Sequence, residues 1–246
     1  MVFNGINYTD GQEICECFNN FFHSVFVQPQ KQNTLVSCNL MSYSNPSILT
    51  LLDSVSFDEE IVFKELKNVN INKGAGPDGI HPILISKCAK ELLKPITLLF
   101  KKSLSSGVFP EYWKLALITP IPKNCQKNII TQYRPISKLS IFGKILEKIV
   151  TSHIVYAIHH LISDKQHGFI KSRSVESNML TFTDYLLNAM DSNYQVDVVY
   201  TDFSKAFDKI NHDILMKKLG NIGIHGNLLR WIESYIRNRC QAVCLK

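Results

Sequence analysis

Two aspartates near the C-terminal end are the residues of this chain best suited to do chemistry. Asp202 and Asp208 lie six residues apart in the run VDVVYTDFSKAFDKINHDIL, which covers Val196–Leu215. The β-branched and aromatic residues before Asp202 favour a strand over 196–200, followed by a turn and a helix. A carboxylate at the end of a rigid strand suits Mg²⁺, which takes oxygen ligands in near-octahedral geometry. The alternative is a structural turn in which Asp208 lies near the helix start and favours the positive end of the helix dipole.

Composition limits the classes of protein that this chain can be. The 246 residues are 45% apolar, enough for one large domain with its own core. No run of about 18 consecutive apolar residues is present, and the start has no signal-peptide pattern, so we expect no contact with a membrane. The seven cysteines are an odd number without a CxxC pair, which predicts free thiols in a reducing compartment. This favours an intracellular protein of the nucleus or cytoplasm.

Charge is distributed unevenly along the chain. The first 60 residues are acidic and contain a single basic residue, Lys31, whereas residues 101–150 hold nine basic and two acidic residues. A basic middle segment favours a polyanionic partner such as nucleic acid. The alternative is a set of solvated lysines on an exposed helix face.

Periodicity predicts a chain rich in helices with a few strands. Ser56 and Glu59 form a capping box that should begin a helix. A second helix is expected over Pro82–Ser106, kinked or split at Pro95 and ended by Gly107. The remaining expected elements are a strand over Leu115–Lys123, a helix from Ser137 or Ser140 to about His160, a helix capped by Ser174 that ends near Met190, and helices over 212–220 and 227–239.

The N-terminal part is interpreted as a connector. Residues 1–52 are expected to be partly disordered, with one short amphipathic helix in the phenylalanine-rich run Glu13–Val27. The polar stretch Gln28–Pro46 indicates a loop or linker. Further along, KGAGPDGI at residues 73–80 predicts a tight loop, since glycine accepts positive φ and Pro-Asp-Gly is a turn sequence.

Taken in order, several segments resemble one family. KGAGPDGI, the strand ending in Ile-Pro-Lys, YRPIS, QHGFIKSRS and TDFSKAFD are similar to segments of the reverse transcriptases of non-LTR, LINE-type (jockey-like) retrotransposons. The resemblance implies an α+β fold in which residues 53–246 are a reverse transcriptase domain. They would form the fingers and the first part of the palm of a right-hand polymerase, with the thumb and the rest of the palm absent.

The resemblance also implies roles for individual residues. Asp202 would be the catalytic metal ligand, the backbone carbonyl of Phe203 a second metal contact, Phe207 the steric gate beneath the incoming sugar, and Asp208 a supporting residue. Lys123 and Arg134 would contact the phosphates of the nucleotide. An alternative role for Lys123 is a solvated surface residue, and for Arg134 a buried partner of a carboxylate.

A further segment of the family lies near the template and primer. Here it is Gln166–Ser174, in which Lys171 and Arg173 would contact phosphates. Two positions depart from the family's usual pattern, because Ile170 stands where a basic residue is common and Ser172 where glycine is common.

The implied activity is RNA-directed DNA synthesis. It would use two Mg²⁺ ions, with Mn²⁺ as a substitute, together with dNTPs, an RNA template and a DNA primer. The remaining palm and thumb and an upstream endonuclease would be its partners. The chain contains no Asp-Asp pair, so we expect no synthesis by these 246 residues alone. Two other interpretations are a non-catalytic nucleic-acid-binding relic of such a polymerase and an inert fragment whose exposed sheet edge aggregates.

Overall fold

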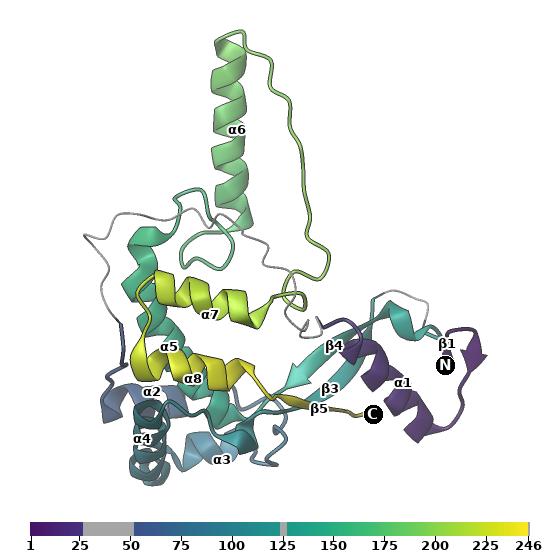
Figure 1. The fold of residues 1–246 in the computed structure, drawn as a ribbon, viewed down its shortest axis with the longest axis vertical. Helices are drawn as coiled ribbons and strands as arrows, with labels where there is room; N and C mark the ends of the chain where they lie inside the picture. Colours follow the sequence, from purple (N-terminus) through teal and green to yellow (C-terminus); the bar gives the residue numbers. More distant parts are fainter. Residues whose placement is uncertain (27–51, 124–126, 246) are drawn as a thin grey trace. The chain divides into compact units, whose positions relative to one another are not determined.

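The computed structural model describes residues 1–26, 52–123 and 127–245, which form a mixed arrangement of helices and small sheets (Figure 1). The predicted linker over Gln28–Pro46 lies outside the described residues. The chain divides into two compact units, one of residues 1–154 with 205–246 and the other of residues 155–204. The strands are β1 (Val2–Phe3), β2 (Ile6–Asn7), β3 (Leu115–Pro122), β4 (Tyr133–Lys138) and β5 (Cys240–Val243). The helices are α1 (Gly11–His23), α2 (Glu59–Lys67), α3 (Pro82–Lys87), α4 (Ala89–Ser106), α5 (Ile141–Ile158), α6 (Val175–Asp191), α7 (His212–Asn221) and α8 (Gly226–Ile236).

The main core of the first unit lies between helices α2, α3, α4, α5 and α8. Its side chains come from the apolar stripes that helical spacing places on one face of each helix. Phe100 and Leu146 are fully buried at its centre, and the rings of Phe109 and Trp231 meet edge to face with centroids 5.4 Å apart. Full burial of each such side chain contributes about 1.5–3 kcal/mol to stability. The apolar periodicity that the sequence displays is therefore the source of this core.

A three-stranded sheet with the order β4-β3-β5 forms the other part of the first unit. β3 pairs antiparallel with β4 and parallel with β5. Ala116 and Ile118 of β3 are buried against Phe18 and Phe22 of α1, so α1 covers one face of the sheet. Since α1 falls in the phenylalanine-rich run, the amphipathic helix expected near the N-terminus is present, and it packs into the first unit.

The predicted N-terminus of α2 was wrong by two residues. The helix begins at Glu59, and the side chain of Asp58 accepts a hydrogen bond from Ile61 N at 2.9 Å. Ser56 therefore does not cap it. An aspartate at the N-cap satisfies a free amide and also places a negative charge at the positive end of the helix dipole.

The helix predicted over Pro82–Ser106 is split, but not at Pro95. The break lies at Cys88, between α3 and α4, and Pro95 stays inside α4. Pro95 is exposed, so water can reach the solvent-facing side of the helix where a backbone hydrogen bond is missing. The predicted stop is confirmed, because Gly107 ends α4 with a φ of 68°.

The second unit consists of an extension of α5, a loop over residues 162–174, α6 and an extended segment. A capping box of Ser174 and Ser177 begins α6, as the sequence predicted for Ser174. The strand expected over 196–200 is absent, because this segment is extended but pairs with no other strand among the described residues. Val199 and Tyr200 are 85% and 84% exposed. Strand propensity alone does not form a strand, since it depends on a hydrogen-bonded neighbour and on burial.

Within the described ranges, no helix is long and apolar enough to cross a membrane.

Gly76 has a specific packing requirement in the loop over residues 73–80. The turn is closed by a hydrogen bond from Gly79 N to Gly76 O at 3.1 Å, and Gly79 has a φ of 69°. A Cβ atom on residue 76 would lie 2.6 Å from the carbonyl oxygen of Leu139 and 3.1 Å from the Cα of Ser140. The loop therefore approaches the backbone just before α5 so closely that only glycine fits.

We predict that Gly76→Ala lowers the free energy of unfolding by about 1–3 kcal/mol, because the added methyl group must displace rigid backbone. Denaturant unfolding measures this change. Gly74→Ala is the matched control, since a Cβ there meets no atom within 4 Å. Equal effects of the two substitutions would contradict the close packing of Gly76.

Tyr235 makes the stability of the first unit depend on pH in the alkaline range. Burial, with the neighbouring negative charge of Glu147, raises the pKa of Tyr235 to about 12. The folded state therefore keeps this phenol protonated at pH values where the unfolded chain ionises it, which begins near pH 10. The associated stability is present below pH 10 and is lost as the pH rises from 10 through 12.

We expect Tyr235→Phe to flatten the fall in unfolding free energy between pH 10 and 12, as measured by urea unfolding at a series of pH values. Tyr112→Phe is the control, because Tyr112 is 75% exposed. If both variants follow the wild-type pH dependence, Tyr235 does not carry this loss.

Candidate functional site

The β3–β4 hairpin brings together two of the predicted site residues, Lys123 and Arg134. The strand register pairs Ile121 with Arg134, and Lys123 follows the end of β3. Lys123 N donates to Gln132 O at 2.8 Å, which continues the pairing past the strand end. The two cationic side chains are thus fixed near the same end of one hairpin, although they are eleven positions apart in the sequence.

Both side chains are exposed, and in the described part of the chain no carboxylate forms an ion pair with either. The Lys123 ammonium lies 3.4 Å from the carbonyl oxygen of Thr131. Arg134 is therefore not the buried partner of a carboxylate. A guanidinium fork and an ammonium at one hairpin end can donate several charge-assisted hydrogen bonds to phosphate oxygens.

Asp202 and Phe203 lie at the end of the second unit, in the extended segment after α6. Both are exposed, and the Phe203 side chain is 83% exposed. The carboxylate is the right type of donor for a hard divalent cation. However, no group of three or more His, Cys, Asp or Glu side chains that could hold a metal occurs within residues 1–26, 52–123 and 127–245. These residues supply one candidate ligand and do not form a metal site by themselves.

Phe207 and Asp208 belong to the first unit, in the turn that precedes α7. Lys209 N bonds to Lys205 O at 3.2 Å within this turn, and Phe207 is 73% exposed. Asp208 is half-buried. The cap of α7 is Asn211, whose side-chain oxygen accepts from Asp213 N and Ile214 N at 2.9 and 3.1 Å. Asn211, and not Asp208, is therefore the N-cap of α7.

Salt bridges attach the helix after this turn to the core of the first unit. Arg237, just past α8, forms ion pairs with Asp213 of α7 and with Glu233 of α8. α8 in turn leads into β5, which pairs with β3. Partial exposure makes each ion pair weak, about 0–1 kcal/mol, so their effect is to orient α7.

The loop over residues 162–174 contains the two predicted phosphate contacts of the second unit. Lys171 is exposed. One terminal nitrogen of the Arg173 guanidinium lies 3.2, 2.7 and 2.6 Å from the carbonyl oxygens of Ser163, Asp164 and Gln166. Arg173 is thus engaged by its own loop, a set of contacts that no local sequence pattern indicates.

Two residues of the same loop have left-handed backbone conformations. Phe169 has a φ of 62° and Ser172 a φ of 66°. This conformation is unfavourable for residues with a Cβ and is readily adopted by glycine. A glycine, which the sequence comparison with the resembled family led us to expect at residue 172, would adopt this conformation without the strain that a Cβ causes.

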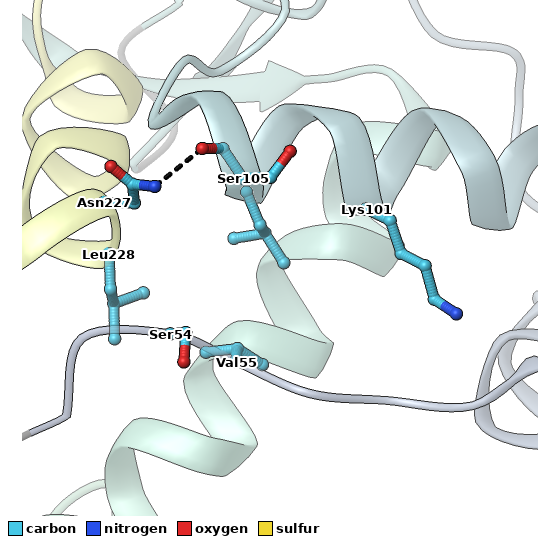
Figure 2. A pocket seen from close by; sticks show the side chains of 7 residues that line it. Ser54, Val55, Lys101, Ser105, Asn227 and Leu228 are labelled. Carbon is cyan, nitrogen blue, oxygen red and sulfur yellow. Dashed lines mark hydrogen bonds between the residues drawn. The ribbon is translucent and has the colours of Figure 1, made fainter.

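A small pocket lies elsewhere in the first unit, between α4, α8 and the segment before α2 (Figure 2). Its volume is about 150 Å³, and Asn227 donates to Ser105 O at 2.6 Å beside it. Lys101 is its only titratable lining residue, and none of the predicted site residues lines it. The pocket therefore provides no catalytic constellation.

We predict that Ser172→Gly stabilises the loop by about 0.5–1 kcal/mol, because glycine relieves left-handed strain at a modest entropic cost. Hydrogen exchange of the amides of residues 163–173 reports this local stability. Ser192→Gly, at a position with a φ of −85°, is the control and should not slow exchange. Faster exchange in the Ser172→Gly loop would show that the serine is not strained.

Comparison with known proteins gives one family. The model of the family "Reverse transcriptase (RNA-dependent DNA polymerase)" matches residues 121–244, about half of the chain. This region contains the β3 end with Lys123, Arg134, the loop over residues 162–174 and both candidate aspartates.

Curated relatives agree with this match. The probable RNA-directed DNA polymerase from transposon BS of Drosophila melanogaster is 27% identical over 229 residues, which cover 90% of this chain and 25% of the relative. The RNA-directed DNA polymerase from mobile element jockey of the same species is 26% identical over 165 residues, which cover 64% of this chain and 18% of that protein. A Pol polyprotein from the type-1 retrotransposable element R2 of Popillia japonica is 26% identical over 118 residues, covering 48% and 16%.

This chain spans about a quarter, or less, of the length of these relatives. The resemblance inferred from the short motifs is confirmed by both comparisons. The chain belongs to the reverse transcriptase (RNA-dependent DNA polymerase) family and is similar to the polymerases of jockey-like and other non-LTR retrotransposons.

Proposed function

We propose that this chain is the nucleotide-binding part of an RNA-directed DNA polymerase and supplies one catalytic carboxylate to it. The observation that carries the proposal is the pair of exposed cations, Lys123 and Arg134, at one end of the β3–β4 hairpin. Both lie within the region that the family model matches. Two cations that are fixed on a sheet, and that have no carboxylate partner among the described residues, suit the triphosphate of an incoming nucleotide.

Lys123 and Arg134 bind the dNTP in this proposal. The planar fork of Arg134 donates to two phosphate oxygens together, while the Lys123 ammonium acts as a point charge. The hairpin holds them before the substrate arrives, so little reorganisation is needed when negative charge develops on the leaving pyrophosphate.

Asp202 is the proposed catalytic metal ligand, with the carbonyl of Phe203 as a second contact. Mg²⁺, or Mn²⁺ in its place, would activate the primer hydroxyl and stabilise the leaving group. The described residues offer too few ligands for this, so further carboxylates must complete the site. Phe207 lies beneath the sugar of the incoming nucleotide and selects against ribonucleotides, and Asp208 supports the turn.

The proposal places the other parts of the chain accordingly. Residues 53–246 are the reverse transcriptase domain, with fingers and the first part of the palm, and residues 1–52 are the connector that precedes it. An RNA template and a DNA primer are the partners, contacted by Lys171 and Arg173, and the further palm, thumb and endonuclease regions complete the enzyme. We propose that the complete enzyme is located inside the cell, in the nucleus or the cytoplasm.

A second candidate is a nucleic-acid-binding protein without catalysis. It is favoured by the lack of any group of three metal-ligating side chains in the described ranges. Such a protein would bind RNA or DNA through its lysine and arginine side chains alone, and its affinity would fall steeply with salt. The two candidate functions differ in whether the Asp202 carboxylate is needed, because only the polymerase uses it to bind a metal ion.

The test begins by sequencing the transcript on both sides of these 246 codons and expressing the complete reading frame. We predict primer extension on an RNA template with Mg²⁺ and a loss of about 100-fold or more in Asp202→Asn, because metal ions contribute several kcal/mol to such reactions. Asp191→Asn, at an exposed acid that ends α6, is the matched control.

Two outcomes would decide against the polymerase. Either the complete protein binds primer–template without extending it, or extension is equal in the wild type and in Asp202→Asn. The first outcome supports the binding protein, and the second removes Asp202 from catalysis.

A further inference from the structure

The feature with no role so far is Phe169, in the loop over residues 162–174. Its side chain is 92% exposed, and its backbone has a φ of 62°. A large side chain in the left-handed region is a true conformational outlier. Such strain persists only where surrounding contacts fix it, and it is common where a residue is held for binding.

The loop contains the contacts that fix it. The guanidinium of Arg173 reaches the carbonyl oxygens of Ser163, Asp164 and Gln166, so that one side chain gathers the start of the loop. Gln166 Nε2 donates to Gly168 O at 3.0 Å. His167 Nδ1 lies 2.9 Å from Ser177 Oγ in the first turn of α6. Phe169 therefore extends from a braced turn.

The residues that flank Phe169 in the sequence include two lysines. Lys165, four positions before it, and Lys171, two positions after it, are exposed, and neither takes part in an ion pair in the described part of the second unit. The single acid of the loop, Asp164, is 3.4 Å from Arg173 and is compensated by it. An exposed aromatic ring between two uncompensated lysines combines a surface for a nucleobase with donors for the adjacent phosphates.

We propose that Phe169 is a stacking contact for a base of single-stranded nucleic acid, with Lys165 and Lys171 on the flanking phosphates. Besides its proposed phosphate contact, Arg173 is then also a positioning residue that shapes the loop. The inference rests on the proposed function, which brings the chain to RNA and DNA strands, and adds to it a base-dependent contact without sequence preference. Stacking suits any base, because every base has a π-face.

The test uses the whole 246-residue chain and two probes, oligouridylate and an abasic oligonucleotide of equal length. Phe169→Ala should weaken binding of oligouridylate by about 5-fold or more and leave the abasic probe unaffected. Circular dichroism of Phe169→Ala checks that the fold is kept. Tyr112→Ala, which removes another exposed aromatic ring, is the matched control and should change neither affinity.

A Phe169→Trp variant reports stacking directly. Both native tryptophans, Trp113 and Trp231, are buried at 7% and 2% exposure, so quenching on addition of oligouridylate arises from residue 169. We expect quenching by oligouridylate and none by the abasic probe. A blue shift with phosphatidylserine vesicles in place of quenching by oligouridylate would assign the ring to a membrane surface and overturn the proposal.

Arg173→Lys separates positioning from charge. It keeps the cation but loses the fork that gathers three carbonyl groups, so in the Phe169→Trp background the base-dependent quenching should fall while abasic binding is retained. Unchanged quenching would refute the positioning role.

The proposal fails if Phe169→Ala binds both probes like the wild type, or if the wild type binds no single strand. Neither result bears on primer extension by the complete protein, which tests the polymerase independently.

Discussion

The register of β3 against β4 is the constraint on which the candidate nucleotide site depends. Ile121 faces Arg134, and this pairing places Arg134 on the sheet face opposite to the one that α1 covers. A slip of one residue would move every side chain of β4 to the other face. Arg134 would then point at the phenylalanine cluster of α1, where an unpaired guanidinium is expensive. The apolar packing of α1 therefore selects the register that exposes the cation.

β3 also connects the sheet to the helical core. Its other edge pairs with β5, which follows α8, and α8 is bound to α4 by polar contacts as well as by apolar packing. The indole of Trp231 donates to Ser103 Oγ at 2.9 Å, and Ser103 Oγ donates to Val108 O at 2.7 Å. Because these groups are buried or half-buried, losing one partner would leave another unsatisfied. The hairpin is thus held by the core of the whole first unit.

What the sequence could predict depended on how local each signal is. Most of α4 and α5 was found from apolar spacing, the start of α6 from its cap at Ser174, and Gly107 as a stop, because these signals act within a few residues. The cap expected for α5 was wrong, since Ser140 Oγ accepts and donates no hydrogen bond among the described residues. The start of α2 was missed because Ser56 and Asp58 both offer a capping oxygen, and the charge of Asp58 decides between them. Lys123 and Arg134 were proposed from family motifs, but their meeting at one hairpin end comes from strand pairing. The contacts of Arg173 and the strain at Phe169 are set by tertiary geometry.

The segment before Asp202, a candidate metal ligand, also depends on tertiary contacts for its structure. Val199 and Tyr200 have strand propensity, but within the described residues nothing pairs with them, and Asp202 follows them as exposed chain. A magnesium ion demands ligands in near-ideal octahedral positions, which an unpaired segment cannot hold without loss of conformational entropy. If Asp202 is the metal ligand that we propose, a neighbouring strand would therefore act on catalysis as well as on the fold, because pairing fixes the backbone from which the carboxylate extends. Metal affinity at Asp202 and strand formation at 196–200 should then be linked, each favouring the other.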